Sequence, residues 1–195
     1  MQILYSDRDI AVCNKPVGLD CEADVPRALS EQLGGNVYPV HRLDKNVGGV
    51  MVYARTKSAA AAISEQIRNG QLIKEYVACV HGSPPPKGDW EDLLFRDRSK
   101  NKVFVVDRIR AGVKKARLEY VCTHPGETSL VKIRLHTGRT HQIRVQFASR
   151  GYPLVGDHKY GARDKESAPM LFSCQLTIPG ESGDLIFSAY PDWYR

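Results

Sequence analysis

Apolar residues along the chain recur in short alternating runs, which are typical of β-strands that bury one face. Nine such runs predict strands, at residues 2–5, 10–13, 37–40, 50–53, 75–80, 103–106, 117–123, 130–135 and 171–176. The alternation is clearest in the fifth run, where a spacing of two residues places Tyr76, Ala78 and Val80 on one face. Strands therefore dominate the predicted structure.

Helices are predicted in the gaps between these strands. Residues 58–68 are rich in helix-forming residues, and Asn69-Gly70 supplies a stop. Another helix is expected from residue 26 to 33, ending at Gly34-Gly35. The proline-rich run 84–88 reads as a surface connection.

A third helix is expected to begin with Thr140 as its N-cap and to end at Gly151, with Ile143 and Phe147 on one face. Many strands with a few helices between them predict a mixed α+β fold, with a large, mostly antiparallel central sheet and flanking helices.

Composition places the chain among ordinary globular proteins. Its 195 residues suit one compact domain, and 42% hydrophobic with 26% charged residues argues against disorder. No apolar run approaches the ~20 residues of a membrane span, and the N-terminus lacks a signal pattern. The five cysteines are odd in number and scattered, which argues against a disulfide framework and a zinc site. We expect a cytoplasmic, reduced, metal-free protein, and a monomer by default.

Charge is unevenly distributed along the chain. Residues 98–165 hold sixteen Lys or Arg against five Asp or Glu, whereas the remainder holds twelve against seventeen. A segregated cationic segment is expected of a surface that binds polyphosphate. Charge that only keeps the protein soluble is the alternative.

One turn between two apolar runs carries candidate chemistry. His41-Arg42-Leu43-Asp44 places a carboxylate beside a fixed cation, where the flanking strands hold the side chain and the turn exposes it. Taken alone, this tetrapeptide is more often a salt-bridged strand end. Two further segments change that interpretation, Lys74-Glu75-Tyr76-Val77-Ala78-Cys79-Val80-His81-Gly82 and Leu135-His136-Thr137-Gly138-Arg139-Thr140-His141-Gln142-Ile143-Arg144.

In this order, the three segments resemble those of the RluA-type pseudouridine synthases, in the RluA and RsuA superfamily, which isomerise uridine to pseudouridine in structured RNA. The resemblance extends to Ile10-Ala11-Val12-Cys13-Asn14-Lys15-Pro16-Val17-Gly18, to Tyr152-Pro153-Leu154-Val155-Gly156-Asp157 and to Lys159-Tyr160-Gly161. It implies a pseudouridine synthase catalytic fold over residues 1–195, with an active cleft between two halves of the sheet. Because Met1 lies almost directly ahead of the first motif, we expect no RNA-binding module before it.

The resemblance also implies the roles of three catalytic residues. Asp44 would be the essential carboxylate, which either attacks C1′ or removes the C2′ proton on a glycal route. Arg144 would be its partner, because a nearby cation keeps a partly buried carboxylate ionised. Tyr76 would stack on the extruded uracil and could take the C5 proton, although a core tyrosine is the ordinary alternative. The reaction conserves atoms and needs no cofactor.

Five more residues are candidates for RNA contact. Because the target nucleotide must leave its stack, His41 and Arg42 would occupy the vacated space, although a structural salt bridge of Arg42 is nearly as plausible. Lys15, Arg139 and Lys159 would bind phosphate, with support of the loop backbone as the alternative for Arg139. The partner is therefore structured tRNA or rRNA, and no membrane or metal is expected.

Two positions depart from the family pattern. Val47-Gly48-Gly49 stands where the family usually has Thr-Ser-Gly, which could change loop rigidity or substrate choice. Leu171-Phe172-Ser173 stands where Leu-His-Ala is common, which is expected to alter packing beneath the site.

Two other functions compete with the synthase. A non-catalytic protein that binds RNA or assists its folding could keep the same scaffold, although binding alone would not need Asp44, Tyr76 and Arg144 together. A carboxylate hydrolase would need a second acidic residue, and Glu75 should face away from Tyr76. A metal site at His136, His141 and His158 has no supporting ligand spacing.

Overall fold

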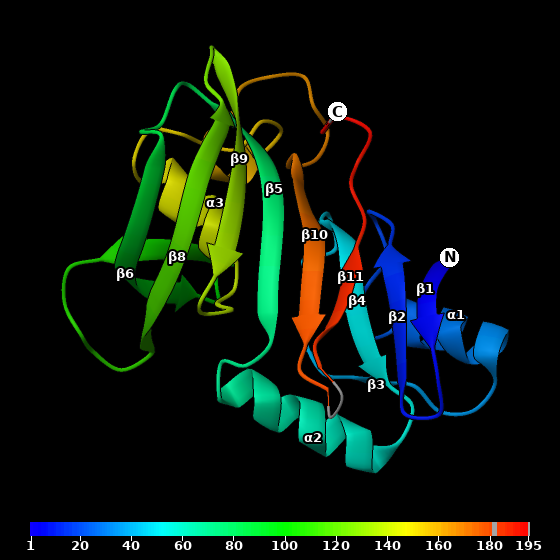
Figure 1. Cartoon of the computed structure of the whole chain (residues 1–195). Helices are drawn as coiled ribbons and strands as arrows, with labels where there is room; N and C mark the ends of the chain where they lie inside the picture. Colours follow the sequence, from blue (N-terminus) through cyan, green and yellow to red (C-terminus); the bar gives the residue numbers. More distant parts are fainter. Residues whose placement is uncertain (181–182, 195) are drawn as a thin grey trace. The chain divides into compact units, whose positions relative to one another are not determined.

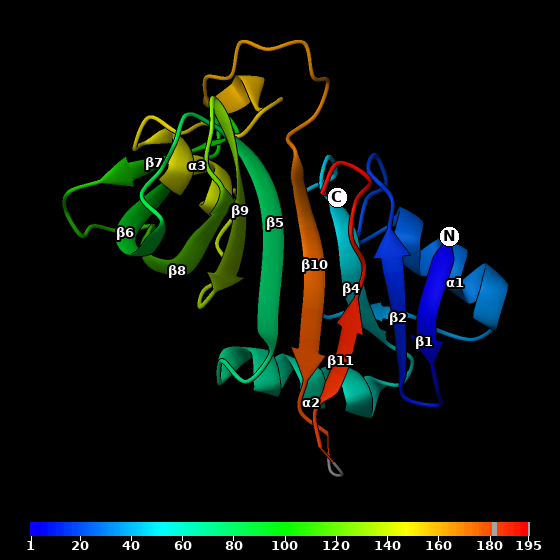
Figure 2. The ribbon, with the colours of Figure 1, turned by 45° about the horizontal axis from the view of Figure 1, so that its top comes forward.

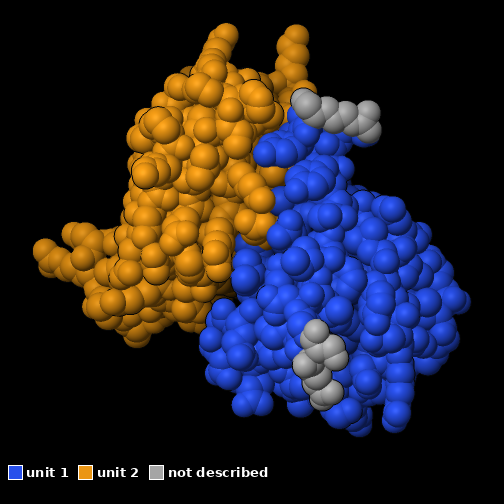
Figure 3. All heavy atoms as spheres, viewed as in Figure 1, with its two compact units in different colours: residues 1–74, 172–195 blue, residues 75–171 orange. Residues whose placement is uncertain are grey.

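The computed structural model describes residues 1–180 and 183–194. Its chain forms two compact units, one of residues 1–74 with 172–195 and one of residues 75–171 (Figure 3). Both combine strands with helices, and all but one of the strand pairings described for residues 1–180 and 183–194 are antiparallel. The predicted mixed α+β fold with a mostly antiparallel sheet is confirmed.

The first unit contains the N-terminal strands and the end of the chain. Its strands are β1 (Gln2–Ser6), β2 (Ile10–Lys15), β3 (Tyr38–Pro39), β4 (Gly48–Ala54), β10 (Leu171–Ile178, from Phe172 on) and β11 (Leu185–Ser188). The order is β1-β2-β4-β10, with β3 paired to β4 and β11 to β10 (Figures 1 and 2). Only the β4–β10 pairing is parallel among the pairings described here.

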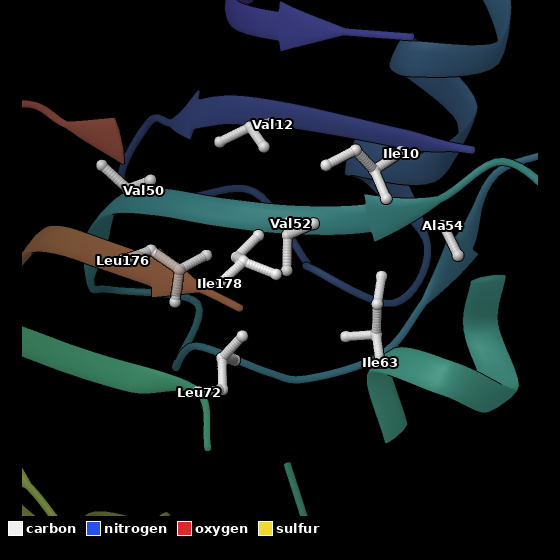
Figure 4. Packing of buried hydrophobic residues seen from close by; sticks show 9 residues of the cluster. All are labelled: Ile10, Val12, Val50, Val52, Ala54, Ile63, Leu72, Leu176 and Ile178. Carbon is white, nitrogen blue, oxygen red and sulfur yellow. The ribbon is translucent and has the colours of Figure 1, made fainter. Parts of the chain in front are cut away.

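Two helices cover this part of the sheet. Helix α2 (Lys57–Arg68) begins after Thr56, whose hydroxyl accepts the Ala59 N–H, and ends at Asn69 as predicted. Its Ile63 packs into a cluster with side chains of β2, β4 and β10 (Figure 4), formed by Ile10, Val12, Val50, Val52, Ala54, Ile63, Leu72, Leu176 and Ile178. Helix α1 (Asp24–Leu33) buries Val25 and Leu29. Burial of every residue of β4 makes that strand a rigid support for the loop ahead of it.

The second unit is a sheet in the order β5-β9-β8-β6-β7. Its strands are β5 (Ile73–His81, from Glu75 on), β6 (Lys87–Asp97), β7 (Lys102–Val106), β8 (Val113–His124) and β9 (Thr128–Leu135). Helix α3 (Gln142–Ala148) and a 3₁₀ turn (His158–Tyr160) pack on it through a core of Leu94, Val103, Ala116, Val145 and Tyr160.

The structure corrects several predicted elements. All nine predicted strands are present, but β6 and β11 were missed. Helix α3 spans only Gln142–Ala148, so Thr140 is not its N-cap. The capping position belongs to His141, in a left-handed conformation with φ 50° and without a side-chain cap. Helix α1 begins two residues before the predicted start. No helix in the described part of the chain is long and apolar enough to cross a bilayer.

Candidate active site

Asp44 lies in the loop between β3 and β4, where its side chain is half-buried. The loop is anchored by the buried side chains of Leu43 and Val47. Its backbone is closed by a hydrogen bond from the Val47 N–H to the Asp44 carbonyl at 2.9 Å. A carboxylate on a loop that is fixed on both sides has little freedom to reorient, as a reacting group requires.

Lys15 lies beneath this loop rather than on the surface. Its side chain is fully buried, and its ammonium donates to the carbonyls of Pro16 and Leu19 at 3.0 Å each and of Lys45 at 3.3 Å. The Gly18 N–H also donates to the Lys45 carbonyl at 2.8 Å. Burial lowers the pKa of Lys15, while nearby acidic groups, Asp44 among them, oppose that shift. This burial does not fit the expected phosphate contact; instead the ammonium joins two loops next to Asp44.

His41 and Arg42 occupy different environments although they are adjacent. The Val52 N–H donates to His41 Nε2 at 3.1 Å, so the proton of the neutral ring is on Nδ1. Burial and the Lys74 ammonium lower the pKa of His41 to about 3. The charge of the ring does not test the predicted place of His41 in the space left by the extruded base, which stays a prediction. Arg42, by contrast, is exposed, with a long 3.9 Å ion pair to Glu22, and its predicted RNA contact stays a prediction.

Tyr76 lies in the buried part of β5, at 6% exposure. The neighbouring Glu75 forms an ion pair with Lys132 of β9, with 3.2 Å between its Oε2 and the lysine Nζ. Alternation along the strand directs these two adjacent side chains to opposite faces. Glu75 is therefore engaged away from Tyr76, which removes support for the hydrolase alternative.

Arg144 is buried on α3 and makes a two-pronged ion pair with Asp157. Its Nε and Nη2 lie 2.7 and 2.8 Å from the two carboxylate oxygens. The ring of Tyr160 lies 5.2 Å from its guanidinium carbon. The surface-arginine alternative is therefore excluded. The predicted pairing of Arg144 with Asp44 stays a prediction, and no local pattern in the sequence indicated Asp157 as a partner.

The turn ahead of α3 is held by the buried side chain of Gln142. Its Oε1 accepts from the Arg139 N–H at 3.0 Å and from the Thr137 hydroxyl at 2.8 Å, and its Nε2 donates to the Arg117 carbonyl at 3.1 Å. Gln142 rather than Thr140 therefore holds this turn, because its longer side chain reaches back across the turn.

Arg139 and Lys159 are both exposed. Arg139 Nε donates to the Lys115 carbonyl at 2.9 Å, so the alternative role in supporting the backbone is present in the structure. Lys159 donates to the Asn101 carbonyl at 3.1 Å. Both cations can still meet solvent or phosphate, and their RNA contacts stay predictions.

The two departures from the family pattern face each other in the sheet. Gly48 pairs with Phe172 and Gly49 with Ser173. A Cβ on Gly48 would lie 3.2 Å from the Phe172 ring, and one on Gly49 would overlap the Ser173 backbone. The small residue at position 48 therefore accommodates the large one at position 172, which is an effect on packing. No metal-binding group of three or more His, Cys, Asp or Glu occurs within residues 1–180 and 183–194.

Comparison with known proteins agrees with this arrangement of motifs. The family model for RNA pseudouridylate synthase matches residues 9–149. The dual-specificity RNA pseudouridine synthase RluA of Escherichia coli K12 is 34% identical, over 98% of this chain and 93% of its own length. An uncharacterized RNA pseudouridine synthase of Aquifex aeolicus is also 34% identical, over 91% of this chain, which spans 63% of that relative.

Solved structures show the same fold. Human RNA pseudouridylate synthase domain containing 4 superposes with a TM-score of 0.83 at 26% identity, over 99% of this chain and 90% of that one. Its counterpart domain containing 1 gives 0.85 at 23% identity, over 97% and 83%, and supports the fold alone. The motif order, the match over most of the chain and the shared fold show that the chain belongs to the RNA pseudouridylate synthase family, whose members are isomerases.

Proposed function

We propose that this protein isomerises one or a few uridines of a structured tRNA or rRNA to pseudouridine, with Asp44 as the essential carboxylate. The observation that carries the proposal is the construction of the Asp44 loop. A fully buried ammonium, that of Lys15, joins three carbonyls next to a half-buried carboxylate. Such a support restricts the position of the carboxylate, which a reacting group requires.

The reaction breaks the bond between C1′ and N1, turns the uracil, and joins C1′ to C5. Asp44 either attacks C1′ and is displaced when C5 bonds to that carbon, or removes the C2′ proton to form a glycal and later returns it. In both routes C5 loses its proton and N1 gains one, so the atoms balance and no oxidant or cofactor is consumed. Asp44 serves either route because it is held beside two anchored loops.

Arg144 and Tyr76 complete the proposed chemistry. Arg144 would hold the Asp44 carboxylate ionised and oriented, since a planar guanidinium can bind one carboxylate on one edge and donate elsewhere. Tyr76 would stack on the detached uracil and take the C5 proton. The substrate nucleotide must first leave its stack, at a cost of a few kcal/mol. Contacts of Arg42, Arg139 and Lys159 with the flanking backbone would offset that cost.

The names of two relatives support RNA as the substrate, and one of them also names the kind of RNA. RluA of Escherichia coli is named for dual specificity, and the Yersinia pestis relative, 33% identical over 85% of this chain, is named for the large ribosomal subunit. This chain spans 93% of the first but only 54% of the second. We therefore propose that the target is a tRNA or rRNA loop. The five free thiols support a cytoplasmic location.

The test is Asp44→Asn, with Glu31→Gln as a control that also changes a carboxylate into an amide, but on the exposed face of α1. Purified proteins are incubated with bulk tRNA and rRNA, and pseudouridine is quantified by mass spectrometry of the nucleosides. We expect Asp44→Asn to lose activity while binding RNA within a few-fold of the unchanged protein, and the control to remain active. Pseudouridine formation by Asp44→Asn would refute the mechanism, and no activity in the unchanged protein would favour the binding-only alternative.

A further inference from the structure

Asp157 and Arg144 form the most enclosed charge pair among the described ion pairs. Their side chains are 0% and 9% exposed, and two parallel hydrogen bonds of 2.7 and 2.8 Å join them. This geometry engages Nε and Nη2 of the guanidinium. The donors on Nη1 are thereby directed away from Asp157. A planar fork bound in this way cannot rotate without breaking both bonds, so Asp157 sets the plane of the guanidinium.

Tyr160 holds the face of the same guanidinium. Its ring lies 5.2 Å from the Arg144 guanidinium carbon, within the range of a cation–π contact. The Tyr160 hydroxyl accepts the Val103 N–H of β7 at 2.9 Å and is hydrogen-bonded to His141 Nδ1 at 2.9 Å. The hydroxyl group therefore ties the ring both to strand β7 and to the start of α3.

The link to His141 matters because its backbone is strained. A φ of 50° is uncommon for a residue other than glycine and persists only where surrounding contacts enforce it. The hydrogen bond to Tyr160 is one such contact. The turn from which α3 places Arg144 is thus locked by the same tyrosine that covers the arginine.

The segment that carries both residues is itself rigid. The Tyr160 N–H donates to the Asp157 carbonyl at 2.9 Å, and the Asp157 N–H donates to Leu154 at 3.0 Å. The preceding Gly156 has φ 79°, and a Cβ there would overlap the Ala168 carbonyl. The Gly156 N–H is also bound by Asp164, at 2.9 Å to the nearer oxygen. These contacts leave the segment little freedom to move, so it can hold Asp157 and Tyr160 in fixed positions.

We propose that Asp157 and Tyr160 are positioning residues, which fix the plane and direction of the Arg144 guanidinium for the isomerisation. This inference rests on the proposed function of Arg144. In this proposal, Asp157 acts through Arg144 and contacts neither the uridine nor its phosphates. Loss of Asp157 should therefore slow the chemical step while leaving RNA affinity nearly unchanged, because a displacement of a reacting group by about 1 Å can cost about 100-fold in rate.

The experiment compares Asp157→Asn with Asp92→Asn. Asp92 makes a similar two-pronged pair with Arg150, just beyond the end of α3, at 2.8 and 3.1 Å. It therefore controls for the loss of a carboxylate–arginine fork close to the end of α3. Single-turnover rates with saturating enzyme and dissociation constants for the same RNA are measured in parallel. We expect Asp157→Asn to lose about 100-fold in rate, with affinity within threefold, and Asp92→Asn to keep the rate within threefold.

A double variant separates positioning from general support. If Asp157 acts through Arg144, then adding Asp157→Asn to Arg144→Lys should slow the reaction by less than threefold further. A rate for Asp157→Asn within threefold of the unchanged protein overturns the proposal, and so does an undiminished effect in the Arg144→Lys background.

Asp157→Glu replaces Asp157→Asn if the latter shows no cooperative unfolding transition. A tenfold or greater loss of rate in Asp157→Glu then supports the proposal, and an unchanged rate overturns it. Failure of the proposed function would be recognised separately, because it appears as pseudouridine formation by Asp44→Asn or as no activity of the unchanged protein.

Discussion

At the scale of single residues, the environment of a side chain outweighs its nominal charge. Lys15 was expected to bind phosphate, yet it is fully buried, and the His41 imidazole is held neutral although histidine often carries charge. Lys15 donates to backbone carbonyls of two loops, and His41 accepts an N–H of β4. Both residues therefore support the Asp44 loop, which is a consequence of burial and not of residue type.

The low pKa of His41 makes the stability of the protein sensitive to acid. The folded protein holds His41 neutral down to a pKa of about 3, whereas the unfolded chain takes up a proton near pH 6.5. The unfolded state therefore binds more protons between these values, and this contribution to stability is lost as the pH falls through that window. Between pH 7 and pH 5 the loss from His41 should be about 2 kcal/mol.

Urea unfolding at the two pH values measures this effect. His41→Gln is the comparison, since its amide can still accept the Val52 N–H but does not titrate. We expect the free energy of unfolding of His41→Gln to fall by about 2 kcal/mol less than that of the unchanged protein. Equal losses in both proteins would show that His41 titrates normally in the fold.

At the scale of elements, the start of α3 depends on the Gln142 side chain, which bonds residues that precede it in the sequence. Thr140 fits the N-cap preference, but the chain passes through a left-handed residue at His141 before the helix begins. The buried Gln142 side chain then bonds Thr137 and Arg139 of the turn and the Arg117 carbonyl of β8. A helix start that depends on such tertiary contacts is not readable from capping preferences alone.

This difference predicts opposite outcomes for two alanine substitutions. Gln142→Ala removes three hydrogen bonds, among them the one that the Arg139 N–H donates, which should cost about 3 kcal/mol of stability. Thr140→Ala should change stability by less than about 0.5 kcal/mol, because Thr140 caps no helix. Chemical denaturation followed by circular dichroism distinguishes them. A larger loss for Thr140→Ala would restore the capping interpretation.

At the scale of the whole molecule, the net charge of +6 conceals a concentration of cations. The cationic stretch 98–165 lies within the second unit, where exposed lysines and arginines flank the ends of β6, β7 and β8. Lys102 lies over the rings of Phe104 and Tyr160, and Arg110 lies over Phe95. Aromatic residues therefore hold some of these cations at defined positions on the surface.

Binding of RNA to such a surface should depend strongly on salt. Each phosphate contact releases condensed counterions, so three contacts should weaken binding about 20-fold between 50 and 200 mM KCl. Charge reversal of Lys100 and Arg110 together should reduce this dependence, whereas Lys57→Glu on α2 of the other unit should not. Filter binding over a salt series gives the slopes. An affinity that does not change with salt would contradict a cationic RNA-binding surface.

The sequence by itself determined the family and most of the strands. Alternating apolar residues predict strands because side-chain direction along a strand repeats every two residues, which is a local property. Strand β6 was not predicted because its first half is polar and follows a proline run. It is a strand because it pairs with β8 over nine residue pairs, a contact between segments far apart in the sequence. Likewise, β11 is short and depends on its pairing with β10.

Only the tertiary structure decided what surrounds the candidate residues. The sequence indicated Asp44 as a candidate because its motif is contiguous, and Arg144 for the same reason. Asp157, thirteen positions after Arg144, became its partner only when α3 and the 3₁₀ turn packed on the same sheet. Lys15 changed from an expected RNA contact to a buried support for the same reason. Burial and long-range contacts arise from the folded chain as a whole, so no local pattern of residues could have revealed them.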